Sequence, residues 1–186
     1  CSKALIVASE NNSAYNDESN IKSGHLWGDG AAAVFVSKEK MSASDLEILA
    51  VDTTGLGNVG KSIEAVTLQP RTGKTNMPYG KDVYIHATQY LVDAIDRILA
   101  DNDFRIGDVD YLITHQANMR IIENVRKKLD LDPSKVLSNI DKLGNTGCAS
   151  TPIVLSENIN KLKIGDLVCI AVFGGGYSSG AILLKK

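Results

Sequence analysis

The chain has few of the residues that mark specialised protein classes. Of its 186 residues only three are cysteine, four are proline and one is tryptophan, and aromatic residues make up 5%. Because three cysteines cannot all pair and their spacing does not suit metal ligation, the sequence argues against a disulfide framework and against a zinc site. So few cysteines are typical of a reducing compartment, and we expect a cytoplasmic protein.

Neither long apolar runs nor an excess of one charge is present. No apolar run approaches the roughly 20 residues of a membrane-spanning helix, and 20 Lys and Arg nearly balance 22 Asp and Glu. We therefore expect neither a membrane nor a nucleic acid as partner. With 44% hydrophobic and 23% charged residues, the composition is typical of a globular domain. The start, Cys1-Ser-Lys3, resembles neither an initiator Met nor a signal peptide, which favours a fragment or a processed piece.

Hydrophobic patterns predict alternating strands and helices, which are typical of an α/β fold. Strands are predicted at 4–9, 28–36, 46–53, 109–114, 136–139, 167–173 and 179–184. Helices are predicted at 84–99, 118–129 and about 150–162, the last with an N-cap at Ser150 or Thr151. This order predicts a mostly parallel mixed sheet with helices on its faces, and the first strand is expected to be buried.

Residues 55–62, Gly-Leu-Gly-Asn-Val-Gly-Lys-Ser, match the phosphate-binding pattern G-x-x-x-x-G-K-[ST]. That pattern binds phosphate where a helix begins at its Lys-Ser pair, because the first amides of the helix hold the anion. Here the segment after Ser62 is short and reaches Pro70, and no apolar strand ending in Asp follows to hold magnesium. We interpret the segment as a glycine-rich surface loop with an exposed Lys61, and a nucleotide binder is the weakest functional hypothesis.

Three corners rich in glycine and polar residues follow predicted strands in the last third of the chain. They are His115-Gln-Ala-Asn-Met-Arg120, Gly144-Asn-Thr-Gly-Cys-Ala-Ser150 and Phe173-Gly-Gly-Gly-Tyr177. Loops at the carboxyl ends of parallel strands meet at one edge of the sheet, so we expect the three corners to line one cleft. An imidazole, a carboxamide and approachable glycine amides together suit an oxyanion site for a thioester or an enolate.

These corners, together with Gly28-Asp-Gly-Ala-Ala32, resemble the 3-oxoacyl-(acyl-carrier-protein) synthase III family of thiolase-fold condensing enzymes. Matching segments occur in family order from residue 1 to residue 186, and the His-Gln-Ala-Asn motif is more specific to this family than the fold is. The resemblance implies a thiolase-like half in which residues 1–37 end the N-terminal half and residues 38–186 form the C-terminal domain. The family is dimeric, so we also expect a homo-oligomer.

The resemblance implies a decarboxylative Claisen condensation of acyl-CoA with malonyl-acyl-carrier-protein in fatty-acid biosynthesis. His115 and Asn145 match the residues that stabilise the thioester enolate, and Gly175 matches an amide of the oxyanion hole. The family segment that contacts the substrate arm and the acyl carrier protein corresponds to Gln116, Ala117, Asn118, Arg120, Lys127 and Lys128. The implied chemistry uses the two thioester substrates and needs neither a metal nor a prosthetic group.

The nucleophilic cysteine of the family has no counterpart in this chain. It lies in the N-terminal half of the family, and Cys1 stands too close to the first predicted strand to replace it. The resemblance therefore implies a missing N-terminal half as a partner. We expect the chain alone to be inactive in condensation.

Two other interpretations stay open from the residues alone. Cys148 lies near Asn145 in sequence, and with His115 it would complete a Cys-His-Asn set for nucleophilic catalysis. The resembling family has a small residue at a buried helix start here, so we expect Cys148, like Cys169 in its apolar strand, to lie in the core. The alternative function is a non-catalytic subunit that binds an acyl chain or a partner. Separately, the simplest interpretation of Arg120, Lys127 and Lys128 is a solvated helix face.

Overall fold

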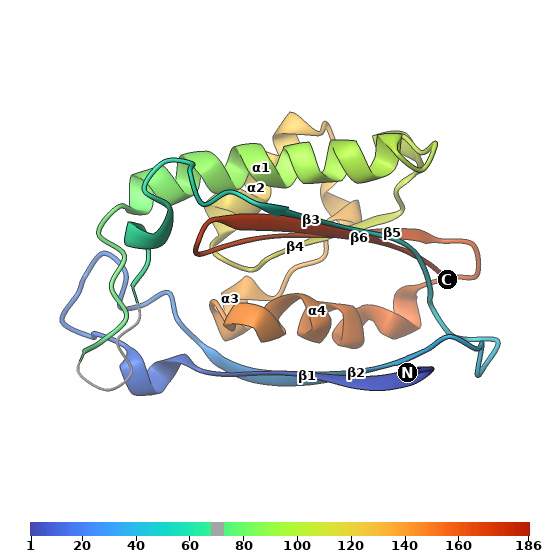
Figure 1. Cartoon of the computed structure of the whole chain (residues 1–186), viewed down its shortest axis with the longest axis horizontal. Helices are drawn as coiled ribbons and strands as arrows, with labels where there is room; N and C mark the ends of the chain where they lie inside the picture. Colours follow the sequence, from blue (N-terminus) through green and yellow to red (C-terminus); the bar gives the residue numbers. More distant parts are fainter. Residues whose placement is uncertain (68–72) are drawn as a thin grey trace.

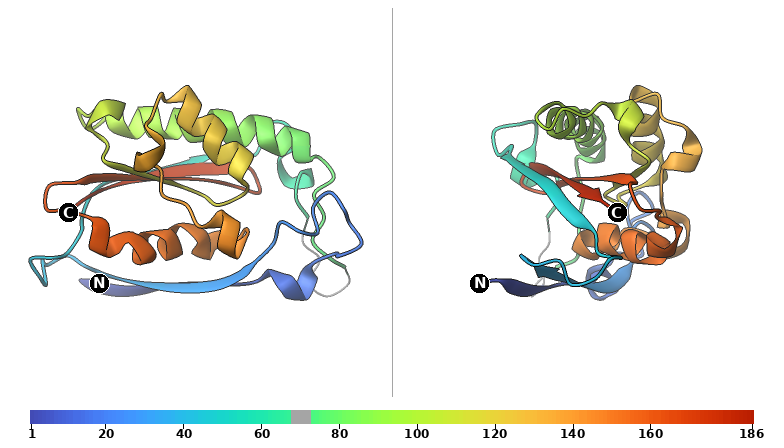
Figure 2. Two further views of the ribbon diagram at one scale, coloured as in Figure 1. Left: turned by 180° about the vertical axis from the view of Figure 1, so that it is seen from behind. Right: turned by 90° about the vertical axis from the view of Figure 1, so that its right-hand side faces the viewer.

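Helices and sheets alternate in layers in the computed structural model, which describes residues 1–67 and 73–186 (Figure 1). Helices α1 (Gly80–Ala100) and α2 (Met119–Lys128) cover one face of a four-stranded sheet. Helix α4 (Ser150–Asn158) lies between the opposite face and a separate two-stranded sheet, as the views in Figure 2 also show. The α/β class with helices on both faces of a mixed sheet is therefore confirmed.

The six strands divide into these two sheets. Their bounds are β1 (Lys3–Asn11), β2 (Asp29–Ser37), β3 (Glu47–Gly55), β4 (Tyr111–Thr114), β5 (Leu167–Gly174) and β6 (Ser178–Lys185). Strands β1 and β2 pair with each other, and the larger sheet has the order β3-β6-β5-β4. Only the β4–β5 pair is parallel among the described strands of that sheet, because a tight turn joins β5 to β6 and β3 then pairs antiparallel with β6. Parallel pairs are thus fewer than the sequence predicts.

The predicted strand at 136–139 is wrong. One isolated parallel bridge joins Val136 to Leu112, and the Leu137 amide donates to the Leu112 carbonyl at 2.9 Å. The chain then turns at Asn139, where the single helical turn α3 (Ile140–Leu143) begins. This early turn leaves no length for a strand.

Helix α1 confirms the helix predicted at 84–99 and extends it at its N-terminal end. Its buried positions recur at helical spacing and include Leu91, Ala94, Ile95 and Ile98, each at most 2% exposed. This stripe packs against β5 and β6, so burial of the apolar face fixes the helix on the sheet. Within the residues that the structure describes, neither this helix nor any other has the length and apolar character needed to cross a membrane.

The segment that matches the phosphate-binding pattern is a loop, as its sequence predicts. After β3 the chain makes turns and a single 3₁₀ turn, Ser62–Glu64, which is too short to present a helix N-terminus to phosphate. Lys61 is exposed, and its ammonium lies 4.9 Å from the centre of the Tyr79 ring. Residues 68–72, on the way to Gly80, lie outside the described part of the chain.

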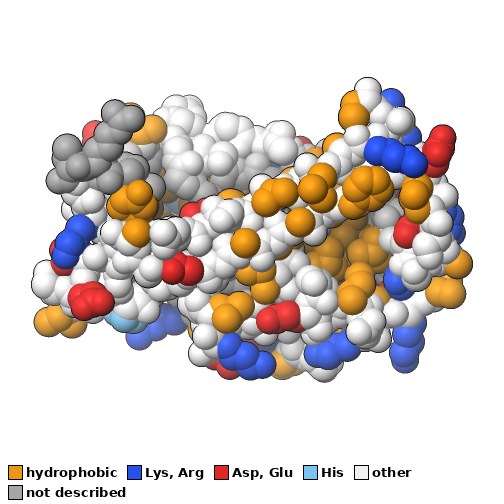
Figure 3. Space-filling view, turned by 90° about the horizontal axis from the view of Figure 1, so that it is seen from below, with side chains coloured by type: hydrophobic (Ala, Val, Ile, Leu, Met, Phe, Trp, Pro, Cys, Tyr) orange, Lys and Arg blue, Asp and Glu red, His pale blue; other side chains and the backbone are white. Residues whose placement is uncertain are grey.

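Strand β1 is exposed, although its apolar pattern predicts burial. Leu5 and Val7 lie on one face of the strand and are each 64% exposed. Phe35 of β2, directly opposite Leu5, is 56% exposed on the same face. Figure 3 shows hydrophobic side chains gathered over this sheet. The two-stranded sheet therefore presents an uncovered apolar surface.

We expect the uncovered face of the β1–β2 sheet to drive self-association, since contiguous apolar surface favours contact with another chain. Replacing Leu5 with Asp should shift the chain toward monomer in sedimentation velocity at micromolar concentrations. Ile164→Asp is the matched control, because Ile164 is 86% exposed in the turn before β5 and does not belong to this sheet. A wild-type chain that is monomeric, or an equal response of the two variants, would contradict this expectation.

Candidate active site

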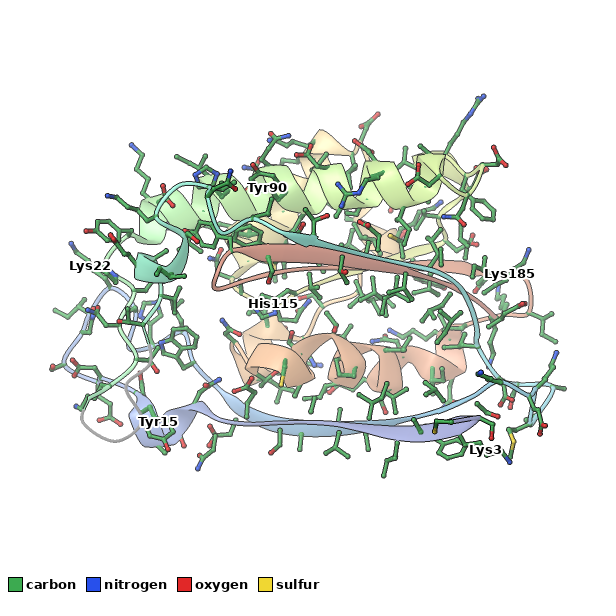
Figure 4. All side chains as sticks on the ribbon, in the orientation of Figure 1. Lys3, Tyr15, Lys22, Tyr90, His115 and Lys185 are labelled. Carbon is green, nitrogen blue, oxygen red and sulfur yellow. The ribbon has the colours of Figure 1, made fainter. Side chains whose placement is uncertain are left out.

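A cavity of about 550 Å³ opens where β4 and β5 end. The corners after these strands and the loop before α4 line it together, and His115, Asn145 and Gly175 all belong to its wall. Figure 4 shows His115 in the layer between the four-stranded sheet and helices α3 and α4. Apolar side chains form much of the remaining wall, among them Leu26, Trp27, Met77, Val83, Ala87 and Leu91. The structure thus brings together three residues that are far apart in the sequence.

His115 is held from both its backbone and its ring. Its amide donates to the Ala171 carbonyl of β5 at 2.8 Å, which continues the β4–β5 ladder by one residue. Its ring Nδ1 lies 2.8 Å from the hydroxyl oxygen of Ser150 at the start of α4. That oxygen also accepts from the Gln116 amide at 3.4 Å. No other described group accepts the hydrogen of this buried hydroxyl, so we assign Ser150 as the donor to Nδ1. A neutral ring in this arrangement carries its proton on Nε2.

The sequence predicts Ser150 or Thr151 as the N-cap of α4, but neither residue has this role. The helix begins at Ser150, Ala149 occupies the cap position, and no side chain caps the first turn. The hydroxyl is used for His115 instead, which explains the polar residue at a position that is 1% exposed. Pro152 still lies in the first turn, where its missing N–H costs little.

The environment of His115 keeps the imidazole neutral at physiological pH. Burial lowers the pKa of His115 from 6.5 to about 4, and the carboxylate of Glu10 opposes this effect only in part. A neutral imidazole acts as a hydrogen-bond donor through Nε2 rather than as a cation. The site therefore suits stabilisation of negative charge on a substrate oxygen without a prior protonation.

Asn145 is fixed by the chain that leads into β2. Its amide donates to the Leu26 carbonyl at 2.7 Å, and its carbonyl accepts from the Gly28 amide at 2.9 Å. A Cβ atom on Gly28 would lie 1.9 Å from the Leu143 carbonyl oxygen, so a residue without a side chain is needed there. Gly28, just before β2, therefore packs closely against the end of α3.

The side chain of Asn145, which lines the cavity, has a free NH₂ group. Its Oδ1 accepts from the Gly147 amide at 3.0 Å, which determines which end of the carboxamide is the oxygen. Among the described residues no group accepts a hydrogen bond from Nδ2, although the residue is only 8% exposed. Asn145 thus offers an uncharged donor to a ligand in the same cavity as His115.

The glycine turn between β5 and β6 supplies backbone donors. Pairing of the two strands ends at Gly174 and Ser178, and Gly176 has a φ of 130° that favours glycine. A Cβ atom on Gly175 would meet nothing within 4 Å, so no neighbouring group requires a glycine there. Within the described part of the chain no group accepts from the Gly175 amide. The exposed N–H is therefore available to a ligand.

The prediction that Cys148 lies in the core is wrong. Cys148 is exposed on the cavity wall, and its amide donates to Glu10 Oε1 at 2.9 Å. Partial burial and then Glu10 raise the pKa of the Cys148 thiol, which lowers its thiolate fraction. Since His115 bonds to Ser150 rather than to Cys148, the geometry does not support a Cys-His-Asn nucleophile. Cys169, in contrast, is buried in β5 as predicted, and burial raises its pKa to about 12.

Gln116 cannot contact a partner, contrary to the role that the sequence resemblance implies. It is fully buried, its amide nitrogen donates to the Thr114 carbonyl, and its Oε1 accepts from Ser138 and from the Asn139 amide. Its contacts fix the segment after β4 to the segment before α3. Gln116 is therefore a structural residue behind the site.

The other predicted contact residues are accessible. Ala117 and Asn118 line the cavity, and Asn118 Oδ1 also caps α2 by accepting from the Ile121 amide at 3.0 Å. Arg120, Lys127 and Lys128 are exposed on α2. Helix α2, which begins directly after the cavity residues Ala117 and Asn118, thus carries three exposed positive charges.

Sequence reasoning missed Glu10 and Ser150. Glu10 lies at the end of β1, where nothing in the local pattern distinguishes it from a solvated carboxylate. Ser150 has the pattern of a helix cap, and the same hydroxyl chemistry serves both roles. Only the position of α4 beneath β4 shows which partner the hydroxyl binds.

The chain matches two models of one family. Residues 99–186 match "3-Oxoacyl-[acyl-carrier-protein (ACP)] synthase III C terminal", and residues 1–55 match "3-Oxoacyl-[acyl-carrier-protein (ACP)] synthase III". A curated beta-ketoacyl-[acyl-carrier-protein] synthase III from Wolbachia pipientis subsp. Culex pipiens (strain wPip) is 35% identical over 184 residues, which are 98% of this chain and 57% of the relative. Another from Acidiphilium cryptum (strain JF-5) is 32% identical, over 100% of this chain and 59% of the relative.

Solved structures share the fold. The crystal structure of 3-oxoacyl-[acyl-carrier-protein] synthase III from Aquifex aeolicus VF5 has a TM-score of 0.87 and 32% identity, and covers 100% of this chain and 58% of its own. These structures place the chain among proteins of the thiolase fold. It belongs to the 3-oxoacyl-(acyl-carrier-protein) synthase III family. The chain spans 57–59% of the length of these curated relatives.

We expect His115 to make the chain less stable in mild acid. Its pKa is about 4 in the folded chain and the ordinary 6.5 in an unfolded one, so the unfolded state binds more protons between these values. Stability is therefore lost as pH falls from about 6.5 toward 4, by about 2 kcal/mol at pH 5 relative to pH 7.5. Urea denaturation at the two pH values should show this loss in the wild type and a smaller loss in His115→Gln. His25→Gln, at an exposed loop position, is the control; equal losses in all three proteins would contradict the account.

Proposed function

We propose that the chain supplies the enolate-stabilising and oxyanion-binding parts of a decarboxylative Claisen condensing enzyme of fatty-acid biosynthesis. The observation that carries this proposal is that His115 and Asn145 line one cavity, and that no described group accepts a hydrogen bond from His115 Nε2 or Asn145 Nδ2. Two uncharged donors on one oxygen suit an enolate, because they bind the anion more strongly than the neutral ester. The neutral state of His115 supports this role.

The reaction step follows from these donors. A malonyl thioester enters the cavity with its thioester oxygen toward His115 Nε2 and Asn145 Nδ2. The bond to the carboxylate carbon breaks, CO₂ leaves, and the electron pair becomes a thioester enolate whose negative oxygen accepts both hydrogen bonds. The enolate carbon then attacks an acyl thioester, and the Gly175 amide donates to the tetrahedral oxyanion that forms. As the oxyanion collapses, the acyl carbon–sulfur bond breaks and the thiolate that carried the acyl group leaves.

The nucleophile that carries the acyl group comes from outside this chain. Cys169 is buried, the pKa of Cys148 is raised, and Cys1 lies exposed at the start of β1, away from the cavity wall. We assign residues 1–37 to the end of an N-terminal half and residues 38–186 to the C-terminal domain, and the missing half would complete the uncovered β1–β2 sheet. The relatives support this assignment, because this chain spans only 57–59% of their length. Alone, the chain would not condense thioesters.

The substrates are acyl-CoA and a malonyl group on an acyl carrier protein, with no further cofactor. Ala117 and Asn118 at the cavity wall suit the thioester's pantetheine arm, since Asn118 offers an amide at the wall. Arg120, Lys127 and Lys128 suit an acidic carrier surface through charge complementarity. We place the protein in the cytoplasm as a homo-oligomer.

Reconstitution with a synthase III N-terminal segment that carries the cysteine tests the catalytic role. Condensation should appear on mixing, and His115→Ala or Asn145→Ala should each lower the malonyl decarboxylation rate about 100-fold, as expected for loss of one oxyanion donor. His25→Ala is the control, because His25 is exposed outside the cavity wall. Condensation that survives His115→Ala would contradict the assignment. Acyl binding without any condensation would favour a non-catalytic subunit.

Carrier docking has its own test. Arg120→Glu should raise the KM for the malonyl-loaded acyl carrier protein about fivefold at low salt. A repulsive charge weakens the contact most when little salt screens it. The KM for malonyl-CoA should stay the same. Lys163→Glu, exposed after α4, is the matched charge reversal and should change neither value. Equal effects of Arg120→Glu on both substrates would exclude a carrier-specific contact.

A further inference from the structure

The glycine turn that contains Gly175 is hydrogen-bonded to the loop between β3 and α1. The Leu56 amide donates to the Tyr177 carbonyl at 2.8 Å, and the Ser62 hydroxyl donates to the Gly176 carbonyl. Both carbonyls that follow Gly175 on its C-terminal side are therefore bonded to the same loop. Ser62 is 6% exposed and has a left-handed φ of 41°, which is uncommon for serine and indicates that neighbouring contacts hold it.

Asp82 ties the loop and the turn together. This carboxylate, in the first turn of α1, accepts from the Lys61 amide at 2.9 Å and from the Tyr177 hydroxyl at 2.8 Å through the same oxygen. The Lys61 amide is the main cause that lowers the pKa of Asp82, and the Tyr177 hydroxyl lowers it further, so the carboxylate stays charged. Tyr177 is 2% exposed, and its ring lies 4.8 Å from the Phe173 ring. The tyrosine is thus anchored at both ends.

Gly60 is the residue that lets the loop approach α1. A Cβ atom there would lie 2.4 Å from His86 Nε2 and 2.6 Å from Asp82 Oδ1, and Gly60 has a φ of 51°. The glycine and the serine of the apparent phosphate-binding pattern therefore have a structural explanation. Gly60 permits the close approach, and Ser62 bonds to the glycine turn.

Three consecutive glycines lose more backbone entropy on ordering than other residues would. An oxyanion donor is effective only when it is held within about 0.5 Å of its working position. We propose that Ser62 and Tyr177, the latter through Asp82, are positioning residues that order the Gly174–Gly176 turn and so place the Gly175 amide for the acyl-transfer oxyanion. This inference rests on the proposed function of Gly175, but the ordering of the turn is independent of it.

A comparison of two tyrosines tests the ordering in the chain alone. Tyr177→Phe removes the hydroxyl that bonds to Asp82 and keeps the ring. Tyr90→Phe is the matched control, because Tyr90 also stacks on Phe173, at 6.3 Å, and lies outside the cavity wall. Amide ¹⁵N relaxation should show lower order parameters at Gly175 and Gly176 in Tyr177→Phe, with Tyr90→Phe like the wild type. Unchanged order parameters in Tyr177→Phe would overturn the proposal. Ser62→Ala provides the same test should Tyr177→Phe fail to fold.

Activity of the reconstituted enzyme tests the consequence for catalysis. Tyr177→Phe and Ser62→Ala should each slow acyl transfer about 10-fold, less than loss of the donor itself. Malonyl decarboxylation, which depends on His115 and Asn145, should change less than twofold. Equal loss of both rates, or no loss of acyl transfer, would overturn the positioning role. If the variants show a less ordered turn but the reconstituted wild type transfers no acyl group, the proposed function is contradicted. The ordering of the turn by Ser62 and Tyr177 would still be supported.

Discussion

The hydrogen bond between His115 Nδ1 and Ser150 Oγ is the interaction on which the site depends. It joins the end of β4 to the start of α4, and so brings the corner after β4 against the loop that carries Asn145. It also leaves Nε2 as the donating nitrogen of a ring that burial keeps neutral. Each of the other two donors is backed by a distant segment: Leu26 and Gly28 hold Asn145, and the loop before α1 holds the glycine turn. The cavity is therefore assembled from parts that are far apart in sequence.

Much of the fold could be predicted because burial leaves a periodic trace in the sequence. The stripe of α1 and the apolar run of β5 specify a helix and a buried strand before any tertiary contact is known. The predicted strand at 136–139 fails because Asn139 turns the chain after a single bridge, and periodicity does not register where a chain turns. The burial predicted for β1 is wrong for a different reason. An apolar pattern indicates that burying the strand is favourable, but it does not identify the segment that packs against it. Leu5 and Val7 remain exposed in this chain.

The candidate site was predictable as a set of loops and less so as a set of contacts. His115, Asn145 and Gly175 follow from residue chemistry and from family resemblance, and they do share one cavity. Gln116 and Cys148 could not be placed, because adjacent residues in a corner point in different directions and only coordinates decide which is buried. The cap pattern at Ser150 indicates only that its hydroxyl forms a hydrogen bond. Which partner it bonds to depends on how α4 lies beneath β4. Side-chain direction is tertiary information.

The central claim is that His115 and Asn145 donate to one substrate oxygen. A crystal structure of the chain with a stable amide analogue of malonyl-pantetheine measures this directly. We expect the amide carbonyl oxygen of the analogue, which takes the place of the thioester carbonyl oxygen, to lie about 3 Å from both His115 Nε2 and Asn145 Nδ2. This is a normal hydrogen-bond length. An analogue whose carbonyl oxygen contacts only one of the two side chains, or lies elsewhere in the cavity, would contradict it.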